Sequence, residues 1–163
     1  MKKLINNKKG FTLIELLAVI VILAILVMVS IPAVMRYLDT ARKGTFSDAA
    51  ATAVSAVRND VIINGIQGKK TYTLGKATNG KYPDGTINNL LEQKLTNSPY
   101  GKPYNESSYI TVDVNNESTK YYICLVDGDK KGIKVESTKI DKSKVEDNVT
   151  CDAASDTWPD SNS

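Results

Sequence analysis

Residues 8–35 read "KKGFTLIELLAVIVILAILVMVSIPAVM". Two lysines and a glycine lead into an apolar run that has no charged residue from Leu16 to Met35. As a helix, about 20 residues span roughly 30 Å, which is the hydrocarbon thickness of a bilayer. The stretch therefore predicts a membrane-inserted helix near the N-terminus, with one carboxylate, Glu15, close to its beginning.

The charge distribution predicts which side of the membrane each part occupies. The 163 residues include 21 basic and 18 acidic side chains, a net charge of +3, but four of the lysines precede the apolar run. Without the first ten residues, 17 basic residues remain against 18 acidic ones. Positive residues stay cytoplasmic, so the N-terminus is expected inside and the chain beyond about Arg36 outside. Nothing in the remainder indicates a nucleic-acid-binding surface.

The two cysteines and the absence of histidine limit which catalytic and metal sites the chain can form. Cys124 and Cys151 are the only two cysteines, and both belong to the outer part, where disulfides persist. A bridge between them would close a loop of about 28 residues and stabilise the domain by roughly 3–4 kcal/mol, whereas the alternative is two free buried thiols. The sequence has no histidine, which removes His-based triads and most zinc sites. We expect no enzyme activity, no cofactor and no metal.

Hydropathy alone leaves two interpretations of the apolar run, a cleaved secretory signal and an uncleaved anchor. A secretory signal has an apolar region of roughly 7–15 residues and a small-residue cleavage site, and this run is longer. The stretch "KKGFTLIELL" (8–17) closely resembles the processing site of type IV pilins and related pseudopilins. The resemblance extends over the basic leader of residues 1–10, Phe11, Glu15, the apolar helix and its Pro32.

The resemblance implies a role for each of these residues. A prepilin peptidase would cut after Gly10 and methylate the new amine, leaving N-methylphenylalanine at Phe11. Glu15 would then meet this amine on a neighbouring subunit, and a carboxylate in an apolar filament core needs such a partner. The alternative for Glu15 is an interfacial residue whose carboxylate snorkels to water. Pro32 matches the family's helix-breaking proline and is expected to bend or locally melt the helix.

Helical periodicity continues beyond the apolar run and predicts one long helix from Thr12 to Asn64. The "Asn64-Gly65" pair is a good C-terminal stop. The first half of this helix is apolar on all sides, whereas the second half is amphipathic. Its apolar stripe recurs at spacings of three and four, at Phe46, Ala50, Ala53, Val57 and Val61.

Three later segments alternate as strands do: "SYITVDV" (108–114), "KYYICLV" (120–126) and "GIKVEST" (132–138). We expect them to form an antiparallel meander that buries the helical stripe. The result is an α+β protein in which a long N-terminal helix packs on a small antiparallel sheet, and the resemblance implies that this is the type IV pilin fold.

Between helix and sheet, residues 65–107 read as a connecting region. It holds a possible short strand near Tyr72–Leu74 and a short helix in "GTINNLLEQKL" (85–95), with Thr86 as its N-cap. The whole chain thus divides into a cleaved leader (1–10), a membrane and filament-core helix (11–35), an amphipathic helix half (36–64), the connecting region (65–107), and the sheet with a disulfide-closed C-terminal region (108–163).

Two short segments need separate interpretation. "DGDKKG" (127–132) begins like a calcium loop, but Lys131 occupies a ligand position, so a hairpin turn is favoured. "SPYGKPY" (98–104) resembles the Pro-aromatic-Gly-x-Pro-Tyr segment of major pseudopilins and their Gram-positive pilin relatives. Its two prolines and its glycine predict a fixed turn with a structural role.

The preferred hypothesis is a structural subunit of a type IV pilus, a homopolymer for adhesion, twitching motility, aggregation or biofilm formation. Its expected partners are the prepilin peptidase, an inner-membrane assembly platform and assembly ATPases. It would lie in the cytoplasmic membrane before assembly and in a cell-surface pilus afterwards. The alternative is a pseudopilin of a type II secretion or DNA-uptake system, favoured by residues 98–104. A membrane-anchored enzyme is a third and much weaker hypothesis.

Overall fold

The computed structural model describes residues 10–115 and 117–153, and it forms two units, Met1–Asp39 and Thr40–Ser163. The long helix α1 (Leu13–Ile63) belongs to both units and agrees with the predicted helix to within one residue at each end. Residues 1–9 of the predicted leader (1–10) lie outside the described part of the chain, as do residues 154–163 of the predicted C-terminal region.

In the first unit, α1 exposes its side chains in every direction. All residues from Gly10 to Leu38 are exposed, including Phe11 at 92% and Ile20 at 54%. Within the described residues, α1 is the one helix that is long and apolar enough to cross a membrane. Of the two outcomes expected at Pro32, a bend or local melting of the helix, local melting is not seen, because α1 continues through this residue. A proline removes a single backbone hydrogen bond, and the helix is held together here by the bonds on either side.

In the second unit, one face of α1 is buried against the sheet. The predicted stripe is confirmed, with Phe46, Ala50, Ala53 and Val57 each fully inaccessible to solvent. The sheet contributes the other side of this core, which includes Tyr72, Ile110, Val112, Ile123, Leu125 and Ile133. The burial of these apolar side chains is the main force that holds helix and sheet together.

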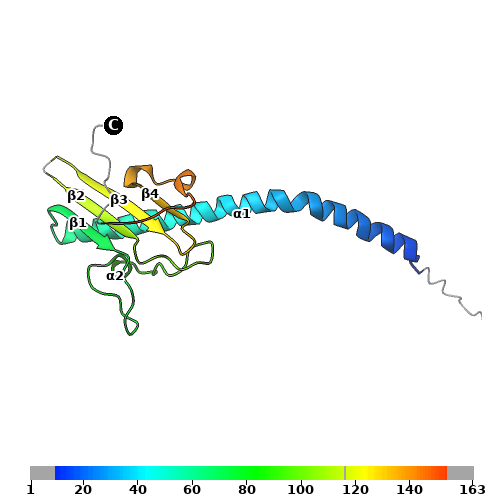
Figure 1. The fold of residues 1–163 in the computed structure, drawn as a ribbon, viewed down its shortest axis with the longest axis horizontal. Coiled ribbons are helices and arrows are strands. Elements are labelled where there is room, and N and C mark those ends of the chain that lie inside the picture. Colours follow the sequence, from blue (N-terminus) through cyan, green and yellow to red (C-terminus); the bar gives the residue numbers. More distant parts are fainter. Residues whose placement is uncertain (1–9, 116, 154–163) are drawn as a thin grey trace, which may run out of the picture. The chain divides into compact units, whose positions relative to one another are not determined.

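The sheet has four antiparallel strands in the order β1-β2-β3-β4 (Figure 1). The strands are β1 (Gly68–Thr73), β2 (Tyr109–Val114), β3 (Thr119–Val126) and β4 (Gly132–Glu136). The three predicted strands are confirmed. The short strand suspected near Tyr72–Leu74 is a full edge strand that begins earlier, because Gly68 to Thr73 pair with Val114 to Tyr109 of β2.

Three short helices complete the architecture. The predicted helix after residue 85 is α2 (Ile87–Leu90), and the 3-10 turns Ser137–Lys139 and Lys142–Lys144 follow β4. Thr86 occupies the N-cap position of α2, but its side chain makes no capping hydrogen bond. The Thr86 hydroxyl instead donates to the carbonyl of Pro83 at 2.7 Å.

The C-terminal end of α1 is fastened to β1. The backbone turns at Gly65, whose φ of +59° favours glycine, as the "Asn64-Gly65" stop predicted. Asp60, on the last turn of the helix, accepts hydrogen bonds from the Tyr72 hydroxyl and the Asn64 amide, both at 2.8 Å. Burial, followed by this contact with Asp60, raises the pKa of the Tyr72 hydroxyl. The hydrogen bond between Asp60 and Tyr72 therefore holds the end of the long helix against the edge strand β1.

The predicted disulfide is present. Cys124 of β3 is bonded to Cys151, with a Cα–Cα distance of 5.7 Å. The segment that follows β4 is therefore tied to the strand before it, at a position where Cys124 is fully buried.

Replacing both cysteines by alanine is expected to lower the free energy of unfolding by about 3–4 kcal/mol, because the unfolded chain loses the closed loop. The measurement is urea denaturation of a fragment that starts at Arg36, which we expect to be a soluble monomer. A reductant should lower the stability of the native fragment but leave the double variant unchanged. Equal stability of the two fragments under oxidising conditions would contradict the prediction.

Candidate processing and assembly site

The bond that follows Gly10 lies in an accessible position. Gly10 and Phe11 are exposed and precede the first helical residue, Leu13. No heavy atom outside its immediate chain neighbours comes within 4 Å of the position that a Cβ on Gly10 would occupy. Among the described residues, the backbone at Gly10 and Phe11 is therefore exposed and non-helical, as a site of peptide-bond cleavage needs to be.

Thr12 and Glu15 form a reciprocal capping box at the start of α1. Glu15 Oε2 accepts hydrogen bonds from the Thr12 backbone N–H at 2.8 Å and from the Thr12 hydroxyl at 2.9 Å. The Glu15 backbone N–H in turn donates to Thr12 Oγ1 at 3.3 Å. Such an arrangement satisfies backbone donors that a helix N-terminus otherwise leaves free. This pair was not predicted from the sequence, although Thr-x-x-Glu before an apolar run is its known signature.

The capping box gives Glu15 a partner within its own chain. Polar groups in an apolar environment have to be satisfied by hydrogen bonds, and Thr12 supplies two donors to a single carboxylate oxygen. Within residues 10–115 and 117–153, the other oxygen, Oε1, makes no hydrogen bond. Glu15 therefore caps its own helix and still has one oxygen that can accept from a further cation or donor.

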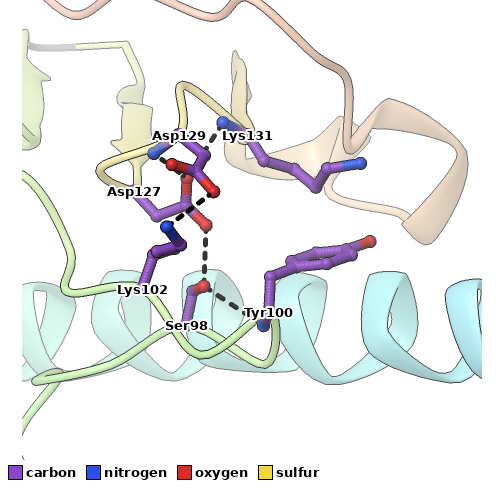
Figure 2. Close-up of polar contacts among 6 residues, drawn as sticks. All are labelled: Ser98, Tyr100, Lys102, Asp127, Asp129 and Lys131. Carbon is purple, nitrogen blue, oxygen red and sulfur yellow. Dashed lines mark hydrogen bonds and ion pairs between the residues drawn. The ribbon is translucent and has the colours of Figure 1, made fainter.

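A second polar cluster lies where the turn between β3 and β4 meets residues 98–104 (Figure 2). Its centre is Asp127, which is 1% exposed. Asp127 Oδ1 accepts hydrogen bonds from the backbone N–H groups of Asp129 and Lys131, both at 3.0 Å. Asp127 Oδ2 accepts from the Ser98 hydroxyl at 2.7 Å. One carboxylate thus shapes the hairpin turn and fastens a distant segment to it.

Residues 98–104 form a compact turn that is clipped to the same hairpin. The Ser98 N–H donates to the Lys102 carbonyl at 2.7 Å, and the Gly128 N–H donates to the Pro103 carbonyl at 2.9 Å. The Tyr104 ring packs edge-on against Phe46 of α1, with ring centroids 5.4 Å apart. Burial, with a smaller contribution from the charge of Asp127, raises the pKa of the Tyr104 hydroxyl. The segment therefore joins helix and hairpin.

Cations surround the outer side of this cluster. Lys102 forms an ion pair with Asp129 at 3.2 Å. The ring of Tyr100 has the Arg42 guanidinium 5.8 Å and the Lys131 ammonium 4.5 Å from its centroid. Lys131 also donates a hydrogen bond to Asp147, which lowers the pKa of that carboxyl. These contacts are exposed at their outer ends and contribute modestly to stability.

The buried carboxylate of this cluster accepts hydrogen bonds from protein donors on both of its oxygens. Within the described residues, no group of three or more His, Cys, Asp or Glu side chains is arranged to hold a metal ion. The interpretation of "DGDKKG" as a hairpin turn is confirmed by the pairing of β3 with β4 on either side of it.

Comparison with known proteins identifies the N-terminal part of the chain. Residues 5–31 match the family model of the prokaryotic N-terminal methylation motif. No curated protein and no solved structure matches the chain. The matched stretch includes Gly10, Phe11 and Glu15.

Together with the helix-on-sheet fold, the motif supports a type IV pilin-like prepilin with a class III signal peptide. The motif implies processing by a prepilin peptidase and use of the pilus assembly machinery, and it points to a structural subunit. The motif and the apolar half of α1 also indicate anchoring in the membrane before assembly.

The first prediction from this site concerns Thr12. A Thr12→Ala variant loses the hydroxyl that accepts from the Glu15 N–H, so the first helical amides should exchange with solvent about two- to tenfold faster. The measurement is amide hydrogen exchange of residues 13–15 in the detergent-solubilised chain. The matched control, Thr12→Ser, keeps the hydroxyl and should exchange as the native chain does. Identical exchange in all three proteins would show that the capping box does not form.

The second prediction concerns Asp127. An Asp127→Ala variant removes the acceptor of three hydrogen bonds, one buried and two partly buried, and should lose about 3 kcal/mol of unfolding free energy. Asp127→Asn keeps an acceptor oxygen and should lose less. Lys102→Ala removes only an exposed ion pair and should stay within about 0.5 kcal/mol of the native value. Urea denaturation of the fragment that starts at Arg36 measures the unfolding free energy of all three variants. An equal loss for Asp127→Ala and Lys102→Ala would contradict the central role of Asp127.

Proposed function

We propose that this protein is a structural subunit of a type IV pilus, which polymerises through its N-terminal helix into filaments on the cell surface. The observation that carries the proposal is the combination of the methylation motif with a helix whose apolar side chains are exposed in every direction. Such filaments serve adhesion, twitching motility, aggregation or biofilm formation. The chain then acts mechanically, as a polymer, and is itself the substrate of a processing enzyme.

The exposed half of α1 supports polymerisation through physical chemistry. Its apolar residues need an apolar environment, which the bilayer supplies first and the helices of other copies supply afterwards. Exchange of lipid for other helices costs little hydrophobic free energy, because lipid tails are as apolar as leucine side chains. The same surface can therefore serve as membrane anchor and as filament core.

Gly10 and Phe11 are assigned to processing. The peptidase cuts after Gly10, and the new amine of Phe11 is methylated. This amine has an ordinary pKa of about 7.7–8.0 and carries a positive charge at neutral pH. The accessible, non-helical backbone at Gly10 and Phe11 supports the assignment.

Glu15 and Pro32 are assigned to assembly. The free Oε1 of Glu15 accepts from the Phe11 amine of a neighbouring copy while Oε2 remains with Thr12. A missing pair would leave charge in an apolar core, so the contact selects the correct register between copies. Pro32 has no N–H, and the carbonyl of Met28 therefore lacks its usual helical donor. That point is where the helix opens most easily during packing.

The assigned partners follow from this scheme. They are other copies of the chain, the prepilin peptidase, an inner-membrane assembly platform and cytoplasmic ATPases. The protein lies in the cytoplasmic membrane with its N-terminus inside before assembly, and in a surface pilus afterwards.

The second candidate is a pseudopilin of a type II secretion or DNA-uptake system. The feature that favours it is the segment "SPYGKPY" (98–104), which is fastened to the β3–β4 hairpin through Ser98 and Asp127. The disulfide between Cys124 and Cys151 and the size of the sheet domain favour a pilus subunit instead. Both candidates share the same processing and the same helix.

The test is an intact mass with N-terminal sequencing on protein sheared from the cell surface. We expect high-molecular-weight material whose chains begin at methylated Phe11, because filament subunits are processed before they are assembled. Whole cells from which the surface material has been sheared provide the control for membrane-bound subunits.

Each other outcome overturns a specific part of the proposal. A processed chain found only in the membrane fraction would favour the pseudopilin. A chain that keeps residues 1–10 would remove the processing step, and with it the roles assigned to Phe11 and Glu15.

A further inference from the structure

The chain contains two Asn-Gly pairs, Asn64-Gly65 and Asn79-Gly80, and the two asparagine side chains differ in their hydrogen bonds. Both pairs are exposed to solvent. An asparagine before glycine is open to attack by the following backbone nitrogen, because glycine has no side chain to hinder the approach. We propose that Asn79 is a spontaneous deamidation site in the folded protein and that Asn64 is protected.

Asn79 lies at the tip of a small hairpin formed by residues 78–81. Thr78 and Lys81 exchange backbone hydrogen bonds, at 2.8 Å from the Thr78 N–H and 3.1 Å from the Lys81 N–H. Asn79 and Gly80 are the two central residues and have φ angles of +50° and +76°. Within the described part of the chain, the Asn79 side chain makes no hydrogen bond. Its carboxamide is free to rotate toward the Gly80 nitrogen.

Asn64, in contrast, is held by hydrogen bonds from both its side-chain amide and its backbone N–H. Its side-chain amide donates to Asp60 Oδ1 at 2.8 Å, and its backbone N–H donates to the Asp60 carbonyl at 2.9 Å. Asp60 is itself held by the Tyr72 hydroxyl. The Asn64 carboxamide thus points back along the helix, and it must break a hydrogen bond before its carbon can approach the Gly65 nitrogen.

The reaction needs no partner other than water. The Gly80 nitrogen loses its proton and forms a bond to the side-chain carbonyl carbon of Asn79, and ammonia leaves. Water then opens the resulting cyclic imide, on one side to aspartate and on the other to isoaspartate. Each event replaces a neutral amide by a carboxylate, and nothing is oxidised or reduced.

The consequence is a change of surface charge with time. Every conversion adds one negative charge to an exposed turn, and the isoaspartate product also lengthens the backbone of the hairpin. The inference concerns the folded chain and does not depend on polymerisation. In a filament, it would make old regions more acidic than new ones, and that extension rests on the proposed function.

The test follows both asparagines in one sample. The full chain is kept in detergent in a mildly alkaline buffer and sampled over time. A protease specific for lysine and arginine, used in a mildly acidic buffer, places Asn64 in residues 59–69 and Asn79 in residues 77–81. Mass spectrometry detects each conversion as a gain of about one dalton.

We expect Asn79 to convert about tenfold or more faster than Asn64 in the folded chain, since orientation controls such intramolecular attacks. In denaturant with reductant, the two rates should approach each other. Asn79→Gln should abolish the fast conversion. Equal rates in the folded chain, or faster conversion at Asn64, would overturn the proposal.

A matched pair of variants tests the protection of Asn64. Asp60→Ala removes the acceptor and should raise the Asn64 rate severalfold, whereas Asp60→Asn keeps an acceptor oxygen and should leave the rate low. Circular dichroism checks that both variants stay folded. A folded Asp60→Ala variant in which Asn64 remains slow would refute the protective role of this hydrogen bond.

Discussion

A helix that is apolar on every side is stable only where an apolar medium surrounds it, and the first half of α1 is such a helix. Its exposed residues extend from Leu13 to Leu38 without a single buried side chain. This constraint explains why polar side chains in the segment form hydrogen bonds with residues three or four positions away. Glu15 is bound by Thr12, and the Ser30 hydroxyl donates to the Leu26 carbonyl one turn earlier. Apart from Oε1 of Glu15, the side chains of Glu15 and Ser30 find hydrogen-bond partners within the segment, so its apolar surface is left for lipid or for other helices.

In the second unit, α1 packs against the sheet. From Phe46 to Val61 it buries one stripe against the sheet, and its end is locked to β1 through Asp60 and Tyr72. The β3–β4 turn is in turn fixed by Asp127, which also binds residues 98–104 through Ser98. The sheet domain is therefore stabilised by an apolar core on one side and by a few buried polar contacts at its turns. None of these contacts depends on the apolar half of α1.

The features that could be predicted from sequence are those with a local signal. The limits of α1 follow from its periodicity and from the Asn64-Gly65 stop, and β2 to β4 follow from alternation. The extent of β1 was underestimated because Lys69 and Lys70 interrupt its apolar pattern at the edge of the sheet. The contact between Ser98 and Asp127 joins residues 29 positions apart, so no local pattern reports it. The Thr12–Glu15 capping box does have a local sequence signature, Thr-x-x-Glu before an apolar run.

The disulfide has a consequence for proteolysis. The segment between Cys124 and Cys151 carries exposed lysines at 139, 142 and 144, where a protease finds an accessible chain. A single cut at any of them leaves both fragments covalently joined, and the strand that contains Cys124 stays in the sheet. The protein can therefore be nicked in this region without shedding its C-terminal end.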